Sequence, residues 1–268
     1  MTRAMALLAG VLLAVPLLDG CGAARRAVQN REPIGDGDER MLGARLSAAV
    51  QAERKSASDP TVIGYVSSLG DRMARLSDRP GIPYVFAVYA DTAAQAFSLP
   101  GGYVYVSTGL LARLGSRAEL AGVLGHEIAH IAARDGVSRI VETVAREGVE
   151  RILLTPRDGP PDPETKRALD AVLAGYPRDV ERAADLAASL LATRVGLNAE
   201  GLVRAMDKVN AGSAAPGMFW ESQPSKSDPI VKRIDGVRAE QKRMGLDAGL
   251  PYDPDSYAPI RARVTGSR

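Results

Sequence analysis

The 268-residue sequence is poor in aromatic residues and carries almost no net charge. Phenylalanine, tyrosine and tryptophan together make up 4% of it, and the formal charge is +2, from 34 basic and 32 acidic residues. Scarce aromatic side chains weigh against a surface that stacks nucleic-acid bases. A balanced charge without a block of like charges gives no basis for binding a polyanion. We therefore expect no nucleic-acid partner.

Cysteine occurs once, at Cys21, which excludes a disulfide within the chain. Before it lies an apolar run, Met5 to Leu18, which is shorter than the ~20 residues that span a bilayer and is typical of a secretory signal. The run ends in Leu18-Asp19-Gly20-Cys21, which resembles a bacterial lipobox apart from Asp19. We expect residues 1–20 to be a lipoprotein signal peptide, residues 21–37 a tether, and lipidated Cys21 an anchor in the periplasm, at the outer membrane. A plain signal peptide or a short anchor is the alternative.

The remaining sequence predicts one mainly helical α+β domain over residues 38–245, followed by a weakly structured tail over 246–268. Hydrophobic residues make up 46% of the chain, which is enough for one sizeable core. Residues 84–89 read as a strand, and residues 96–107 as two short strands joined by the turn Pro100-Gly101-Gly102. Ser116 and Glu119 form a capping-box pattern that begins a helix. Apolar spacing and cap signals predict further helices at about 38–53, 59–76, 108–115, 135–153, 163–174, 179–194, 198–210 and 229–244.

Histidine occurs only twice, and both residues lie in the stretch "GHEIAH" of the helix that begins at Ser116. His126 and His130 are four residues apart, so both imidazoles lie on one helix face and can reach one Zn²⁺ ion. Glu127 is placed to take a proton from a water molecule beside that metal. The small residues around the pair, such as Gly122 and Gly125, are expected to leave room for the metal and a substrate. The alternative is a surface histidine pair beside an exposed glutamate.

The third ligand must be a carboxylate, because no other histidine exists and the one cysteine is expected to be lipidated. The segment 175–192 offers Asp179, Glu181 and Asp185, of which Glu181 and Asp185 again lie on one helix face. We expect Glu181 to complete a His₂Glu site that holds one Zn²⁺ per chain. We expect Asp185 to accept the ring N–H of a ligand histidine. The alternative for Glu181 is a solvated helix face beside Arg182.

Three motifs of the chain together resemble the zinc metallopeptidases of the HtpX and CAAX-prenyl-protease type, in their exported, lipoprotein-like branch. "AFSLPGG" is similar to the family's Asn-Ala-Phe-x-x-Pro-Gly-Gly stretch, "GHEIAHIAARD" to its HExxH helix and "YPRDVERAAD" to its Tyr-Ser-Arg-x-x-Glu-x-x-Ala-Asp segment. The resemblance implies a zincin-like fold in which a second ligand-bearing helix packs against the HExxH helix. It also implies His126, His130 and Glu181 as zinc ligands, Glu127 as catalytic base and Asp185 as the residue that orients a ligand histidine. The lack of a long apolar span after the signal separates the chain from the polytopic members.

Two positions depart from the family pattern. Gln95 stands where the family has asparagine before Ala-Phe, and Asp228 stands where it has the histidine of His-Pro-x-x-x-Arg-Ile. Asp228 is therefore a candidate switch at the zinc or substrate, and the residue that stabilises the transition state is left open. Tyr176, Arg233 and Tyr252 are candidates for that role, each with packing or a surface position as the alternative.

The expected activity is that of a zinc metalloendopeptidase of the bacterial envelope, with Glu127 as general base. Its expected substrates are unfolded, extended or misassembled envelope polypeptides, which would pair with an exposed strand edge at Ala96, Phe97 and Ser98. That segment could instead be a structural hairpin in the core. A non-proteolytic envelope chaperone or assembly factor is one alternative function. A latent protease, with Asp228 blocking the zinc until a regulatory protein partner acts, is another.

Overall fold

The computed structural model describes residues 34–154, 160–211, 230–246 and 249–266. Cys21 and Asp228 lie outside these ranges. The described residues from Asp36 onward form one compact unit. Its described helices are α2 (Asp36–Glu53), α3 (Pro60–Ala74), α4 (Thr108–Arg113), α5 (Arg117–Ala133), α6 (Asp135–Leu154), α7 (Pro163–Leu173), α8 (Arg178–Arg194), α9 (Gly201–Ala211), α10 (Ile230–Arg243) and α11 (Pro254–Thr265). None of these helices is both long and apolar enough to cross a bilayer.

A small sheet stands before the "GHEIAH" helix in the chain. Its strands are β1 (Val85–Tyr89), β2 (Ala96–Leu99) and β3 (Tyr103–Ser107), in the order β1-β3-β2, with β1 parallel and β2 antiparallel to β3. The predicted turn Pro100–Gly102 joins β2 to β3 as one short 3₁₀ turn. Gly102 has a φ of 105°, and a Cβ there would lie 2.1 Å from the Pro83 carbonyl oxygen, so only glycine fits. In the order β1-β3-β2, β2 is an edge strand of the sheet.

Helices cover both faces of this sheet. Phe97 of β2 stacks on Tyr105 of β3, and the Tyr105 hydroxyl lies 2.7 Å from the Ser47 hydroxyl of α2. The opposite face presents Ala96, Val104 and Val106 to the main hydrophobic core, which includes residues of α3 and α5. This alternation follows from the two-residue period of a strand. The expectation of a mainly helical α+β fold with a small sheet ahead of the motif helix is confirmed.

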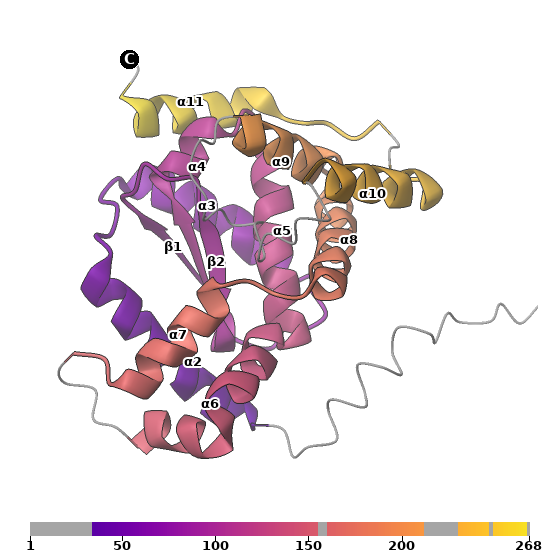
Figure 1. The fold of residues 1–268 in the computed structure, drawn as a ribbon. Helices are drawn as coiled ribbons and strands as arrows, with labels where there is room; N and C mark the ends of the chain where they lie inside the picture. Colours follow the sequence, from indigo (N-terminus) through magenta and orange to yellow (C-terminus); the bar gives the residue numbers. More distant parts are fainter. Residues whose placement is uncertain (1–33, 155–159, 212–229, 247–248, 267–268) are drawn as a thin grey trace, which may run out of the picture. The chain divides into compact units, whose positions relative to one another are not determined.

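Helix α5 is buried around its whole circumference, as a helix at the centre of a core must be. The Ser116 hydroxyl accepts the N–H of Glu119, and the helix ends at Arg134, which has a left-handed φ of 60°. A Cβ on Gly122 would lie 2.4 Å from the Leu202 nitrogen of α9, and one on Gly125 would lie 3.1 Å from the Ala188 Cα of α8. The expectation that these glycines leave room for a metal is therefore wrong. They let α8 and α9 pack closely against α5, as Figure 1 shows for the three labelled helices.

The carboxyl-terminal segment is more ordered than its sequence suggested. Helix α11 starts with Asp253 as N-cap and Pro254 as its first residue, and it buries Tyr257 and Ile260. The Tyr257 hydroxyl donates to the Leu111 carbonyl at 2.7 Å. The prediction of a weakly structured tail is wrong for residues 254–265, because two apolar side chains three residues apart suffice to dock one helix face on the core.

Candidate metal centre

The two histidines of α5 point at one another inside the protein. Their Nε2 atoms are 3.0 Å apart, and both side chains are almost fully buried, with exposed fractions of 1% for His126 and 2% for His130. The spacing predicted that the rings share one helix face, and the structure places them on it.

Helix α8 brings a carboxylate to the same point. Glu181 Oε2 lies 3.4 Å from His126 Nε2, and Glu181 Oε1 lies 3.9 Å from His130 Nε2. One ligand atom from each of these three residues can be chosen so that all lie within 4.8 Å of one another. Glu181 is buried, so a solvated helix face does not describe it. Asp179, the other acid considered for the third ligand, is exposed at the start of α8.

Each histidine also has a carboxylate beside its other ring nitrogen. His126 Nδ1 lies 2.9 Å from Asp185 Oδ1, the position at which the sequence predicted an acceptor of the ring N–H. His130 Nδ1 lies 2.9 Å from Asp135 Oδ2, a partner that the sequence did not predict. Asp135 belongs to the quoted motif "GHEIAHIAARD", but nothing in one sequence reveals that the left-handed Arg134 turns the chain back toward His130. Carboxylates at both Nδ1 atoms favour the tautomer that carries its proton on Nδ1.

Helix α10 places a cation, the Arg233 guanidinium, beside two carboxylates of α8, those of Asp185 and Glu181. Arg233 Nε and Nη2 donate to the two oxygens of Asp185 at 2.8 and 2.7 Å, and Nη2 lies 2.9 Å from Glu181 Oε2. Burial alone would raise the pKa of Asp185, but the Arg233 guanidinium and the His126 hydrogen bond lower it to about 2. Arg233, considered as a transition-state stabiliser, is thus held by carboxylates of α8.

The glutamate of the motif has a different environment. Glu127 is 3% exposed, and burial raises its pKa, although the imidazoles of His126 and His130 act in the opposite direction. A raised carboxyl pKa brings a base closer to the pH at which it can both accept and return a proton. The surface alternative for this motif is excluded, because both histidines and Glu127 are buried.

The other two candidate stabilisers lie in different places. The Tyr176 ring packs on the His130 ring, with centroids 4.3 Å apart. The Tyr252 carbonyl accepts the N–H of Ala118 at the first turn of α5, two helical turns before His126, and the Tyr252 hydroxyl pairs with Glu200. Tyr176 therefore belongs to the centre, and Tyr252 does not.

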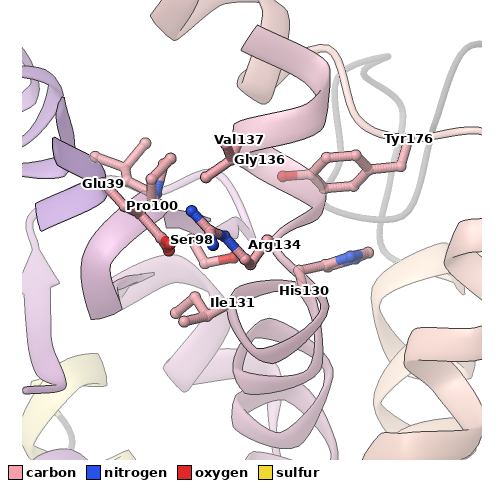
Figure 2. Close-up of a pocket in the computed structure, with 10 residues that line it drawn as sticks. Glu39, Ser98, Pro100, His130, Ile131, Arg134, Gly136, Val137 and Tyr176 are labelled. Carbon is pink, nitrogen blue, oxygen red and sulfur yellow. Dashed lines mark ion pairs between the residues drawn. The ribbon is translucent and has the colours of Figure 1, made fainter. Parts of the chain in front are cut away.

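The residues of β2 lie beside the centre but not on an open surface. All four are buried, and Phe97 faces α2. Ser98 lines a small crevice with His130, Gly136 and Tyr176 (Figure 2). The side chains of Ala96, Phe97 and Ser98 are thus buried, and the expected exposed edge of this strand concerns only its backbone, which lies at the edge of the sheet.

The donor set fits a divalent metal. Both Nε2 atoms offer lone pairs if both protons sit on Nδ1, and a carboxylate faces them, so three acceptors converge on one point. Two nitrogen ligands of a tetrahedral zinc ion with bonds of about 2.0–2.1 Å are about 3.3 Å apart, close to the spacing of these atoms. Burial alone would lower the pKa of His126, yet its hydrogen bonds to Asp185 and Glu181 raise it to about 10. The carboxylates around His126 thus favour positive charge at this position, whether from a proton or from a bound metal cation.

Comparisons with known proteins agree with this geometry. Residues 60–241, more than half of the chain, match the model of Peptidase family M48. A Vibrio cholerae protein whose name contains the words beta-barrel assembly-enhancing protease is 29% identical over 202 residues, which are 68% of this chain and 40% of that protein. Mitochondrial metalloendopeptidase OMA1 of Schizosaccharomyces pombe is 37% identical over 86 residues, 32% of this chain and 25% of its own length.

A shorter relative aligns over most of both chains. Metalloprotease YcaL of Escherichia coli is 25% identical over 237 residues, 82% of this chain and 92% of its own length. The chain thus spans less than half of the first two relatives and nearly all of YcaL. Helix α2, which covers one face of the sheet, lies before the residues that the family model matches.

Proposed function

Since the chain belongs to peptidase family M48, we propose that it is a zinc-dependent endopeptidase that hydrolyses extended or unfolded polypeptides. One observation carries this proposal: the buried convergence of His126, His130 and Glu181 with Glu127 next to them on the same helix. These three residues would hold the metal, and Asp185 and Asp135 would keep the two imidazoles in the required tautomer.

The proposed mechanism divides the work between the metal and Glu127. A zinc ion at this centre supplies Lewis-acid activation of a water molecule and of the scissile carbonyl. Glu127 accepts the proton of the attacking water and delivers it to the leaving amine nitrogen. Its raised pKa suits both directions of transfer. Burial on α5 keeps bulk water away from the carboxylate, which strengthens its interaction with the reacting groups.

The free edge of β2 supplies a way to hold an extended substrate. The Ser107 N–H donates to the Gln95 carbonyl at 2.9 Å, and antiparallel strands repeat this pattern at every second residue. Phe97 and Leu99 therefore direct their backbone groups to β3, whereas those of Ala96 and Ser98 point to the other side. Among the described residues no strand pairs with β2 there. A peptide that adds as a further strand would bond to the backbone of Ala96 and Ser98.

We place the enzyme in the bacterial envelope, with lipidated Cys21 as a membrane anchor and misassembled envelope proteins as substrates. The Cys21 sequence context and the relative named for beta-barrel assembly support this assignment. Metabolic labelling with a fatty acid tests the anchor, because Cys21→Ala should abolish the label.

Metal analysis together with a protease assay tests the proposal. The purified wild type should contain about one zinc per chain and cleave casein. Glu181→Ala should lose both, because two imidazoles alone bind zinc weakly. Wild-type protein that binds no zinc, or a Glu181→Ala variant that keeps both zinc and activity, would contradict the assignment.

Two alternatives remain as separate proposals. An envelope chaperone would still complement a deletion strain after Glu127→Gln, whereas a protease would not. A latent protease blocked by Asp228, which lies outside the described residues, would gain casein-cleaving activity on Asp228→Ala. An unchanged rate with zinc still bound argues against latency.

A further inference from the structure

A crevice beside the metal centre contains a hydroxyl that the proposed mechanism does not use. Ser98, His130, Gly136 and Tyr176 line this crevice, and Figure 2 shows the phenol oxygen of Tyr176 turned toward Gly136. A Cβ on Gly136 would lie 3.4 Å from that oxygen, so glycine leaves space around it. The crevice lies between Ser98 of β2, where a substrate strand would add, and His130 of the metal centre.

The Tyr176 ring is fixed from several sides. Its centroid lies 4.3 Å from that of His130, with 32° between the ring planes. Gly175 before it has a left-handed φ of 79°, and Pro177 after it is the N-cap residue of α8. Tyr176 thus stands five residues before Glu181, directly at the entry of the helix that carries this ligand. Its position is set by the same elements that build the centre.

The hydroxyl of this residue has no hydrogen-bond partner within residues 34–154, 160–211, 230–246 and 249–266. Three buried tyrosines of the fold are satisfied: the Tyr105 hydroxyl pairs with Ser47, that of Tyr257 with the Leu111 carbonyl, and that of Tyr89 with Gln95. The Tyr84 hydroxyl also lacks a partner in the described part of the chain, but Tyr84 does not line the crevice. The Tyr176 side chain is half-buried, so its hydroxyl can be reached by a ligand group that enters the crevice.

The chemistry of the hydroxyl is that of a donor. A phenol O–H can donate one hydrogen bond, and it keeps its proton at neutral pH because the ordinary pKa of tyrosine is about 10. Peptide hydrolysis creates negative charge on the scissile carbonyl oxygen, and this charge is stabilised by donors held in place beforehand. The chain has no third histidine that could serve as this donor.

We propose that Tyr176 is a catalytic residue whose hydroxyl donates a hydrogen bond to the scissile carbonyl oxygen. The phenol keeps its proton throughout, so no bond of the tyrosine is made or broken. This inference rests on the proposed peptidase function. The ring is a separate matter: its packing on His130 helps to hold the imidazole, and phenylalanine would preserve that packing.

The test compares Tyr176→Phe with Tyr176→Leu and Glu127→Gln in the full-length, zinc-loaded protein. With a quenched fluorescent peptide from β-casein, Tyr176→Phe should lower kcat by about 10²-fold, the loss typical of one oxyanion donor, and change KM by less than about twofold. Zinc affinity should be unchanged in Tyr176→Phe and weaker in Tyr176→Leu, which lacks the stacked ring. A wild-type kcat in Tyr176→Phe, while Glu127→Gln is inactive, overturns the inference and leaves the peptidase assignment standing. Turnover by Glu127→Gln overturns the assignment itself.

A binding measurement tests the same hydrogen bond without turnover. A phosphinic pseudopeptide imitates the tetrahedral, negatively charged transition state, whereas the uncleaved peptide does not. Tyr176→Phe should weaken calorimetric binding of the phosphinic compound by about tenfold or more. In the Glu127→Gln background it should leave binding of the ordinary peptide nearly unchanged. Equal affinity of wild type and Tyr176→Phe for the phosphinic compound contradicts the inference.

Discussion

Helix α5 carries two glutamates that are equally buried but have opposite surroundings. Glu119 and Glu127 are each 3% exposed. The Glu119 carboxylate accepts bonds from the Gly115 N–H and the Ser116 hydroxyl and pairs with Lys208 Nζ at 2.7 Å. Glu127 forms no ion pair with Lys or Arg among the described residues, and burial raises its pKa.

The difference between these glutamates separates a structural carboxylate from a functional one. A buried charge is tolerated when cations and N–H groups surround it, as they surround Glu119. A buried carboxylate without such partners is destabilising unless something else requires it there. At Glu127 the neighbouring histidine pair identifies that requirement as the chemistry of a metal centre.

Replacing each glutamate by glutamine should therefore affect different properties. Glu127→Gln should reduce kcat/KM for a peptide substrate by about 10²–10⁴-fold, since a general base is lost. Its zinc content and melting temperature should not fall. The comparison breaks if Glu127→Gln unfolds the protein or leaves the rate unchanged.

The sequence was sufficient to predict the parts of this centre that depend on local periodicity. The four-residue spacing of His126 and His130, and that of Glu181 and Asp185, fixes which side chains share a helix face. Cap residues such as Ser116 located the start of α5. These features need only the helix geometry and its end signals, so one chain suffices to read them.

Contacts between distant segments could not be predicted in this way. Asp135 reaches His130 because Arg134 adopts a left-handed conformation, and Arg233 reaches Asp185 from α10 across 48 positions. The docking of α11 through Tyr257 was also missed. Each contact depends on tertiary packing, which sequence periodicity does not encode.

The two carboxylates behind the histidines should differ in their effect on metal affinity. Asp185 is 1% exposed and is held by Arg233, whereas the Asp135 side chain is 14% exposed. Loss of such a partner typically weakens metal binding by 10–100-fold. Asp185→Asn should lie near the upper limit, because Arg233 then pairs with the ligand Glu181 alone, and Asp135→Asn near the lower limit. Competition with a chelator measures both, and an equal or reversed order contradicts this account.

Glu119→Gln should lower stability without changing the chemistry. The neutral amide removes the ion pair with Lys208 and introduces N–H donors toward the Gly115 N–H, at a cost of about 1–3 kcal/mol. We expect a melting temperature several degrees lower, with zinc affinity and kcat unchanged at 25 °C. The matched variant Lys208→Met tests the pair from its exposed end. A loss of activity with normal stability in Glu119→Gln would assign Glu119 to the functional class instead.

The smallest effect should appear in the pH dependence of the metal-free protein. Folding lowers the pKa of Asp185 to about 2 from an ordinary value of 3.8, so its contribution to stability is complete above that ordinary value and disappears as the pH falls through 2. Folding raises the pKa of Glu127, so the opposite holds for this residue: stability is lost as the pH rises from the ordinary glutamate pKa of 4.5 through the raised pKa of Glu127.

At pH 7 Glu127→Gln should therefore unfold at a slightly higher urea concentration than the metal-free wild type, whereas Asp185→Asn should unfold at a lower one. The gain from Glu127→Gln should vanish below about pH 4, and the deficit of Asp185→Asn should shrink toward pH 2. Curves for the two variants that shift in the same direction at pH 7 would show that α5 and α8 do not hold these carboxylates in opposite electrostatic environments.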